Sequence, residues 1–202
     1  ALYIADGHHR AAAASRIGRD AEAGEKRGHF LAVAFPDTSL KILAYNRLLT
    51  AVNDEMHSTL HGRLLEHFDI QPMDTAQEPA AKGGFSMYVG GQWHSLQLKQ
   101  SAAPDPADPV ASLDVSVLQD LVLNPFFGIE DPRTDNRIEF IGGIRGLGEL
   151  EKRADSSNGV AFALYATSLD ELMKIADTGE VMPPKSTWFE PKLRTGMVIS
   201  RY

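Results

Sequence analysis

The sequence FSMYVGGQWHSLQL, residues 85–98, decides the fold class. Two largely apolar runs flank Gly90 and Gly91, and both glycines can take the positive φ angle that a two-residue hairpin turn requires. The segment therefore predicts two neighbouring antiparallel strands. Because this hairpin interrupts a strict alternation of strand and helix, it favours an α+β fold over a doubly wound parallel sheet.

The flanking sequence supplies the remaining elements. Apolar runs predict strands over residues 2–5, 29–35, 137–141, 159–166 and 197–201. Helical segments are expected from residue 8 to Gly18 or Gly24, and over residues 54–67, 113–123 and 169–177. Residues 41–49 are compatible with a strand or a helix. We expect a mixed, largely antiparallel sheet with packed helices.

Three helix ends carry chemical signatures. The side chain of Asn53 can cap the helix that follows it. Ser168 and Glu171 have the spacing of a capping box, in which each side chain binds a backbone N–H group near the other residue. Pro125 lacks an N–H group and predicts that the helix over residues 113–123 stops before it.

The composition excludes several classes of protein. The chain has 202 residues, of which 43% are hydrophobic and 23% charged, so it can bury a core and is not mainly disordered. With 20 Lys and Arg against 27 Asp and Glu, the net charge is −7, which makes nucleic acid an unfavourable partner. No apolar run approaches the about 20 residues of a membrane span.

The cysteine count and the length bear on compartment and domain organisation. No cysteine occurs, which excludes disulfides and thiol nucleophiles and makes the cytoplasm the default expectation. Residues 1–202 fit a single α+β domain, and a start at Ala1 rather than Met favours a fragment of a longer protein. Residues 101–110 hold three prolines and are a candidate linker.

The run Asp6-Gly7-His8-His9-Arg10 carries the most chemistry. A glycine at a strand-to-helix turn lets the backbone approach a ligand, and the N–H groups of the helix start favour an anion such as phosphate. An arginine adds a bidentate fork, histidines add donors or a proton relay, and Asp6 can bind magnesium or accept a proton from a hydroxyl. The alternative is a plain turn with Asp6 as helix cap.

A second polar cluster lies near the C-terminus. Pro183 and Pro184 stiffen the chain before Lys185, Ser186 and Thr187, whose amine and hydroxyl groups could bind phosphate oxygens. Lys192 and Arg194 follow within a few residues, and Trp188 either packs in the core or covers a ligand. Taken alone, the cluster is more typical of a surface turn.

Together, YIADGHHR at residues 3–10 and MPPKSTWFEPKL at residues 182–193 resemble the family catalogued as domain of unknown function 1015. The likeness extends over nearly the whole chain. In that family the histidine motif lies near the middle, so the resemblance implies that this sequence is the C-terminal half. The family's Thr-His-Arg is replaced here by Tyr45-Asn46-Arg47, which retains only the arginine.

The Asp-Gly-His-His-Arg run is also similar to the phosphate-binding turn of the ParB and sulfiredoxin-like superfamily, which includes free-serine kinases. Sulfiredoxin chemistry needs a cysteine at this turn, and none is present. The kinase resemblance gives Asp6 a catalytic carboxylate role and places His8, His9 and Arg10 at the phosphate. Together with the residue chemistry described above, the predicted catalytic residues are Asp6, His8 and His9. The predicted phosphate-binding residues are Gly7, His9, Arg10, Arg47, Lys185, Ser186, Thr187 and Lys192.

These observations lead to two functional hypotheses. The first is a small-molecule phosphotransferase with ATP or another phosphate donor, Mg²⁺ at Asp6, and free serine as the acceptor that the resemblance implies. Such kinases also use an upstream glutamate, so the chain by itself need not be active. The second hypothesis is a non-catalytic nucleotide-sensing or interaction module of the ParB-like type. The sequence does not define the oligomeric state.

Overall fold

The computed structural model describes residues 1–22 and 25–192, which form two compact units. The larger unit runs from Ile42 to Trp188, and the smaller one comprises residues 1–41 and the residues from Phe189 onward. The expected strand over residues 197–201, Gly24, Leu193 and Arg194 lie outside the described residues. Within the described chain, no helix is both long and apolar enough to cross a lipid bilayer.

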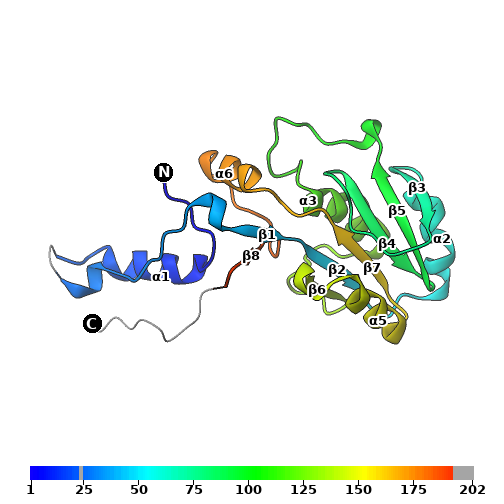
Figure 1. Cartoon of the computed structure of the whole chain (residues 1–202), viewed down its shortest axis with the longest axis horizontal. Coiled ribbons are helices and arrows are strands. Elements are labelled where there is room, and N and C mark those ends of the chain that lie inside the picture. Colours follow the sequence, from blue (N-terminus) through cyan, green and yellow to red (C-terminus); the bar gives the residue numbers. More distant parts are fainter. Residues whose placement is uncertain (23–24, 193–202) are drawn as a thin grey trace. The chain divides into compact units, whose positions relative to one another are not determined.

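The larger unit is built on a six-stranded sheet (Figure 1). The strand order is β3-β5-β4-β7-β2-β6, and each neighbouring pair is antiparallel. The strands are β2 (Tyr45–Leu49), β3 (Phe68–Met73), β4 (Gly84–Val89), β5 (Gln92–Leu98), β6 (Ile138–Gly142) and β7 (Val160–Leu164). This arrangement confirms the expected α+β class with an antiparallel sheet.

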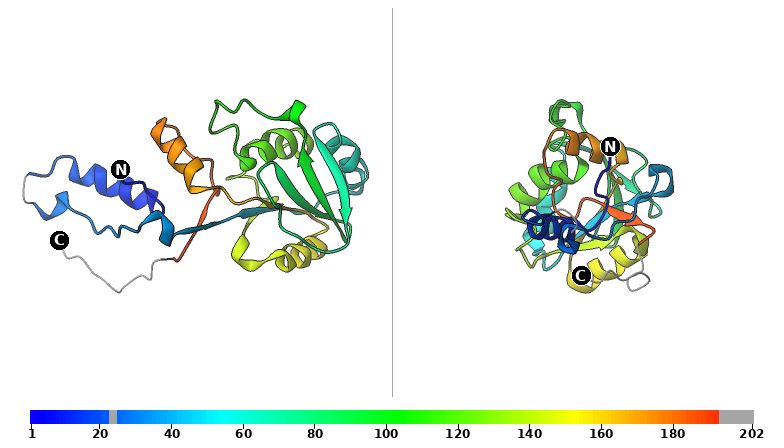
Figure 2. Two further views of the ribbon diagram at one scale, coloured as in Figure 1. Left: turned by 45° about the horizontal axis from the view of Figure 1, so that its top comes forward. Right: turned by 90° about the vertical axis from the view of Figure 1, so that its left-hand side faces the viewer.

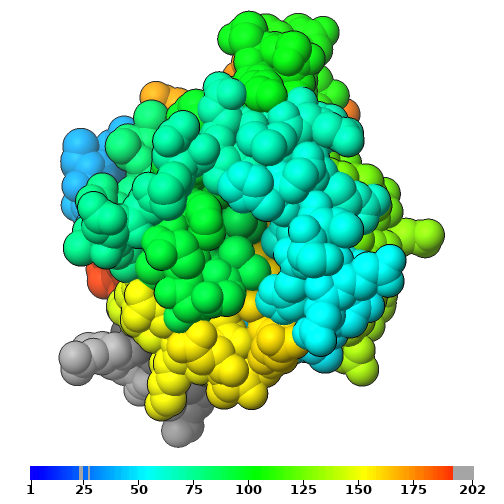
Figure 3. Space-filling view, turned by 90° about the vertical axis from the view of Figure 1, so that its right-hand side faces the viewer, coloured from blue at the N-terminus to red at the C-terminus, as the bar shows by residue number. Residues whose placement is uncertain are grey.

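The β4–β5 hairpin forms as its sequence predicts. Val89 lies opposite Gln92 in the ladder, and Gly90 and Gly91 between them have φ angles of 57° and 80°. The hairpin places β5 between β4 and β3 in the sheet. Figure 3 shows the face of the larger unit on which the turn of the hairpin, in green, reaches the surface.

Helices cover both faces of this sheet (Figure 2). On one face lie α2 (Asp54–Leu64), α3 (Asp114–Leu118), the π-helical segment η4 (Gln119–Leu123) and α4 (Asn124–Phe127). On the other face, α5 (Leu147–Ser157) packs Leu150 and Ala154 against the sheet. The helix α6 (Leu169–Asp177) follows β7 and buries Leu172 and Ile175.

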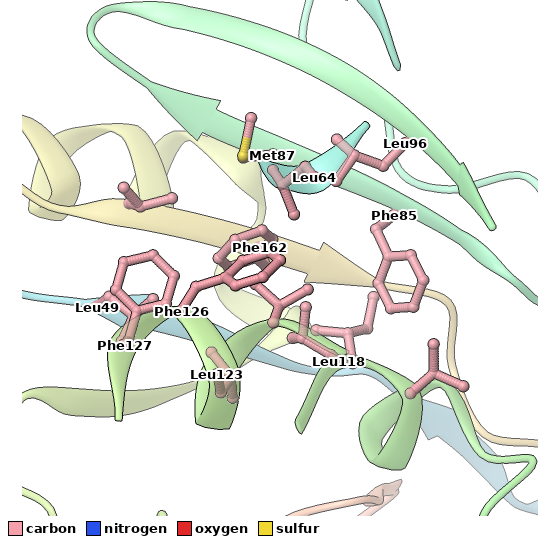
Figure 4. Close-up of a cluster of buried hydrophobic side chains, with 14 of the residues drawn as sticks. Leu49, Leu64, Phe85, Met87, Leu96, Leu118, Leu123, Phe126, Phe127 and Phe162 are labelled. Atoms are coloured by element: carbon pink, nitrogen blue, oxygen red, sulfur yellow. The ribbon is translucent and has the colours of Figure 1, made fainter. Parts of the chain in front are cut away.

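The main core lies between the sheet and the α2–α4 layer (Figure 4). Phe162 of β7 is fully buried at its centre, and Phe68 and Phe85 meet edge to face with ring centroids 5.6 Å apart. Burial of such side chains contributes about 1.5–3 kcal/mol each to the free energy of folding. This core fixes β7 and its neighbour β2, the interior strand that carries the polar residues described below.

The capping signals are confirmed. The side chain of Asn53 accepts a hydrogen bond from the Met56 N–H group at 2.8 Å, and α2 begins at Asp54. Ser168 and Glu171 form the complete capping box of α6. The sequence predicts that the helix after Asn53 extends to residue 67, but α2 ends at Leu64. The chain leaves the helix earlier because the apolar Phe68 belongs to the strand β3, where it is buried.

The expected stop before Pro125 is wrong. Helix continues from α3 through the wider turns of η4 into α4, which ends at Phe127 and is followed by Gly128 with a φ angle of 66°. Pro125 occupies the first turn of α4, where a missing N–H group breaks no bond of that helix. The π-helical segment thus accommodates the proline within a helical path.

The smaller unit holds α1 (His8–Gly18) and two short 3₁₀ turns, η1 (Lys26–Gly28) and η2 (Asp37–Ser39). The strands β1 (Lys41–Leu43) and β8 (Trp188–Glu190), at the ends of the larger unit's sequence, pair with each other, so residues 41–49 are two strands. The strands expected over residues 2–5 and 29–35 are absent. A strand needs a hydrogen-bonded neighbour, and the described part of the chain gives these runs none.

Residues 101–110 belong to the larger unit. They contain part of the short turn η3 (Gln100–Ala102) and two further turns held by the carboxylates of Asp105 and Asp108, each of which accepts backbone N–H groups. The segment is therefore an ordered loop on the path from β5 to α3.

We predict that Asp114 makes the stability of the larger unit depend on pH. Burial raises the pKa of Asp114 to about 6, against the opposing effect of the Gly83 N–H group. The folded protein then holds a proton that the unfolded chain has released, so the free energy of unfolding falls as pH rises from about 4 to about 6. The expected change is at most about 3 kcal/mol.

Urea unfolding of Asp114→Asn between pH 4 and pH 8 tests this expectation. Asparagine keeps an acceptor for the Gly83 N–H group and carries no charge, so the variant should lose this part of the pH dependence and be at least as stable at pH 7. An identical pH slope in both proteins would contradict the assignment.

Candidate functional site

The turn into α1 has the conformation that the phosphate-binding hypothesis requires. Gly7 is the residue before the helix and has a φ angle of 83°, in the left-handed region that favours glycine. Its carbonyl oxygen accepts the first helical hydrogen bond from Ala11 at 2.9 Å. Its N–H group donates to Oδ1 of Asp6 at 2.7 Å, which fixes that carboxylate beside the turn.

The start of α1 is electropositive. No side chain caps it and no acidic residue lies in its first turn, so no side-chain cap satisfies the N–H groups of its first residues. His8, His9 and Arg10 are exposed there. The Arg10 guanidinium folds back over the turn, since a Cβ atom added to Gly7 would lie 3.1 Å from its Nη2 atom.

Asp6 is joined to a residue far along the chain. Nζ of Lys192 lies 3.2 Å from Oδ2 of Asp6, and both side chains are about half exposed. Partial burial tends to raise the pKa of Asp6, but the bonds from Lys192 and Gly7 outweigh it and lower the pKa below its usual value. Asp6 is therefore ionised at neutral pH. The smaller unit thus brings together Lys192 and the predicted residues 6–10.

Arg47 occupies a different environment, in strand β2 of the larger unit, between β7 and β6. It is 4% exposed and its pKa is lowered by burial to about 9. Nη1 donates to the carbonyl oxygen of Tyr45 at 2.8 Å, and Nη2 donates to that of Lys185 at 3.1 Å. The guanidinium also lies 4.5 Å from the ring centroid of Phe140. Among the described residues no carboxylate forms an ion pair with it.

The bond to Lys185 shapes the second predicted cluster. Lys185 has a φ angle of 55°, unusual for a residue with a side chain, and its carbonyl oxygen points to Arg47. Its Nζ atom lies 5.5 Å from the ring centroid of Tyr45, and Tyr45 meets Trp188 edge to face at 5.3 Å. The larger unit therefore joins Arg47 to the loop of Lys185, 138 residues away.

The two predicted hydroxyl groups differ in their freedom to bind a ligand. Ser186 is 4% exposed, and its hydroxyl donates to the carbonyl oxygen of Pro183 at 2.6 Å. Its own carbonyl oxygen accepts a hydrogen bond from Thr167 at 3.3 Å. A phosphate could bind the Ser186 hydroxyl only after that loop bond broke. Thr187 is half-buried.

Sequence reasoning missed Tyr45 as a member of this cluster and Asn46 as a residue that binds β2 to β7. Tyr45 lies under the amine of Lys185, and Asn46 is buried with its Oδ1 atom accepting from the Leu164 N–H group at 3.1 Å. The alternation of side chains along a strand places Tyr45 and Arg47 on one face and Asn46 on the other. That signal was present in the sequence, but it needed the prior assignment of residues 45–49 to a strand.

The described residues offer few ligands for the magnesium ion predicted at Asp6. No group of three His, Asp or Glu side chains in the described chain is placed to hold a metal ion. Asp6 is a single carboxylate whose oxygens already contact Gly7 and Lys192. Magnesium in phosphoryl transfer needs only one or two protein carboxylates with phosphate oxygens and water. Asp6 could therefore contribute one ligand by releasing Lys192.

The family model for proteins of unknown function, DUF1015, matches residues 1–116. The chain belongs to the DUF1015 family. The matched span includes the turn at residues 6–10 and Arg47, whereas the motif at residues 182–193 lies beyond it. No curated protein sequence matches this DUF1015 chain.

Solved structures show which fold this DUF1015 chain shares. A mutant free serine kinase in complex with AMP is similar with a TM-score of 0.50 and 16% identity over 92% of this chain. The chain spans 66% of that kinase. A free serine kinase in complex with AMP gives 0.49 at 16% identity with the same coverage. A conserved hypothetical protein from Pyrococcus furiosus gives 0.48 at 18% identity, covering 92% and 68%.

We predict that Arg47→Lys destabilises the larger unit by about 1–3 kcal/mol. A lysine keeps the positive charge but has no planar fork to reach the carbonyl oxygens of Tyr45 and Lys185 together. Arg63→Lys is the matched control, because the exposed Arg63 also lies over a phenylalanine, at 4.6 Å from Phe126. Urea unfolding should show a change below about 0.5 kcal/mol for the control. Equal losses would refute the proposed importance of the Arg47 bonds.

Proposed function

We propose that this protein is a small-molecule kinase that transfers the γ-phosphate of ATP to a hydroxyl group, with free serine as the acceptor. The observation that carries the proposal is the uncapped start of α1, with Gly7 in the left-handed conformation and the Arg10 guanidinium beside it. The fold shared with a free serine kinase in complex with AMP adds support at the level of architecture.

In this proposal the α1 start binds the phosphate groups of the nucleotide. Phosphate oxygens accept hydrogen bonds from the free N–H groups of the first helical turn, and the helix dipole adds to the attraction. Arg10 contributes two parallel N–H donors, and the exposed His9 contributes another. These groups would stabilise the charge that spreads over the γ-phosphate oxygens in the transition state.

Asp6 is proposed to act as the catalytic base. The acceptor oxygen attacks the γ-phosphorus as the bond from phosphorus to the β–γ bridging oxygen breaks, so ADP leaves. The acceptor proton passes to the Asp6 carboxylate and then to solvent. The lowered pKa keeps Asp6 ionised and able to orient the hydroxyl. His8 is proposed to supply a hydrogen bond or relay this proton.

A magnesium ion bound with the nucleotide would neutralise phosphate charge. Asp6 is the residue proposed to hold it, in exchange for its contact with Lys192. The amine of Lys192 would then be released to bind a phosphate oxygen.

In the larger unit, considered by itself, Lys185 is proposed as a phosphate ligand and Arg47 as the residue that positions it. Arg47 is buried and both of its terminal nitrogens bind carbonyl oxygens, one of them that of Lys185. It therefore acts on a ligand through the loop conformation. Thr187 is proposed to add a hydroxyl donor, and Ser186 to hold the loop closed through its bond to Pro183.

We predict that Arg10→Ala weakens ATP binding by about 10- to 150-fold, equivalent to about 1.5–3 kcal/mol for a charge-assisted pair. Arg16→Ala is the matched control, because Arg16 is exposed on the same helix in its last turn. Calorimetric titration of the natural-length protein with ATP and Mg²⁺ measures both affinities. Equal affinities of Arg10→Ala and the unchanged protein would disprove the phosphate site at α1.

Product formation separates the kinase from the non-catalytic nucleotide-sensing module. Incubation with γ-labelled ATP should place the label on serine, and Asp6→Asn should abolish this transfer while leaving ATP affinity within a few-fold. Transfer of label to another hydroxyl compound would change the acceptor. ATP binding without any labelled product would overturn the kinase proposal and favour the sensing module.

A further inference from the structure

The larger unit contains a cavity of about 300 Å³ between the end of β5, the start of α3 and the exposed side of α6. Its walls combine the apolar side chains of Leu98, Pro104, Pro106 and Val117 with charged groups. A volume of this size is at the lower end of the range for small-ligand sites. None of the residues assigned to phosphate binding lines it.

The proline-rich loop over residues 101–110 forms one wall of this cavity. Pro104, Pro106 and Pro109 all line it. In Figure 3 the segment near residue 100, in bright green, projects at the top of the molecule. Prolines restrict the backbone, so a wall built from them loses little conformational entropy when a ligand binds. The sequence pattern that suggests a linker therefore has a physical role at this cavity.

Asp114 gives the cavity a buried carboxylate with unused bonding capacity. The side chain belongs to α3, and the residue is 8% exposed. Both carboxylate oxygens approach the same donor, the Gly83 N–H group, at 3.0 and 3.1 Å. A carboxylate can accept about four hydrogen bonds, and no ion pair joins Asp114 to a cation within the described chain. A positively charged donor in the cavity would complete its bonding.

Of the other charged side chains that line the cavity, one lysine has no ion-pair partner among the described residues. Lys82 forms an ion pair with Glu171, which also closes the capping box of α6, so these two charges offset each other. Lys174 lies one helical turn after Glu171 and is exposed at the cavity. No ion pair of the described residues includes Lys174. One buried carboxylate and one available ammonium group therefore face the same space, with apolar walls around them.

We propose that this cavity binds a free α-amino acid with an apolar side chain. The ammonium group of the ligand donates to Asp114, its carboxylate pairs with Lys174, and its side chain packs against Leu98, Val117 and the prolines. A ligand with both charges matches the two charged groups of the cavity that form no ion pair among the described residues. This second site is independent of the proposed phosphate transfer, and its occupant need not react.

L-leucine and two analogues test the proposal by calorimetric titration of the natural-length protein without nucleotide. The probe 4-methylpentanoate lacks the ammonium group, and 3-methylbutylamine lacks the carboxylate. We expect leucine to bind, and each analogue to bind at least tenfold more weakly. Absence of leucine binding would overturn the proposal, and so would equal affinity for all three compounds.

Two variants assign the binding to this cavity. Asp114→Asn and Lys174→Met should each lower the affinity for leucine at least tenfold, and Asp114→Asn should leave the weak binding of 4-methylpentanoate unchanged. Asp120→Asn is the control, because Asp120 is an acidic residue nearby in sequence that does not line the cavity. Leucine affinity unaffected by both cavity variants would place the site elsewhere and overturn the proposal. ATP titration of the same variants should be unchanged, which separates this outcome from a failure of the kinase proposal.

Discussion

Arg47 places a buried positive charge on an interior strand of the sheet, where protein atoms must replace the water that a guanidinium normally binds. Two carbonyl oxygens and the face of Phe140 meet that requirement. One of the carbonyls belongs to Lys185, so burying the charge also fixes the loop that follows α6. The position of the Lys185 amine over Tyr45 thus follows from the need to satisfy the buried Arg47 guanidinium in β2, 138 positions earlier in the sequence.

Local chemistry predicted the parts of the fold that depend on neighbouring residues. Gly90 and Gly91 specify the hairpin, and Ser168 with Glu171 specifies the start of α6, because each signal acts within a few residues. The apolar runs at residues 2–5 and 29–35 satisfy the same strand criteria but form no strand. Hydropathy identifies a segment able to join a sheet, whereas the strand itself requires a partner that may be distant in sequence or lie on another polypeptide.

In the candidate site, too, neighbouring residues predict one part of the structure and leave the long-range contacts unpredicted. The conformation of Gly7 and the open start of α1 were predictable from Asp6-Gly7-His8-His9-Arg10, since the turn and the helix are contiguous. The long-range partners of the site residues could not be predicted in this way. Lys192 contacts Asp6 from 186 positions away in the sequence, and Lys185 contacts Arg47 from 138 positions away. Ser186 illustrates the consequence: its residue type suggests a phosphate donor, while its burial and its bond to Pro183 give it a role in closing the loop.

The two long-range contacts, Asp6–Lys192 and Arg47–Lys185, differ in how easily a ligand can replace them. The Asp6–Lys192 pair is about half exposed, and such pairs contribute between about 0 and 1 kcal/mol, so a phosphate or a cation can replace either partner at little cost. Breaking the Arg47 bonds would leave a buried charge without acceptors, which costs several times more. Ligand-dependent rearrangement is therefore expected at Asp6 and Lys192, while the backbone of the Lys185 loop stays in place and only its exposed amine adjusts.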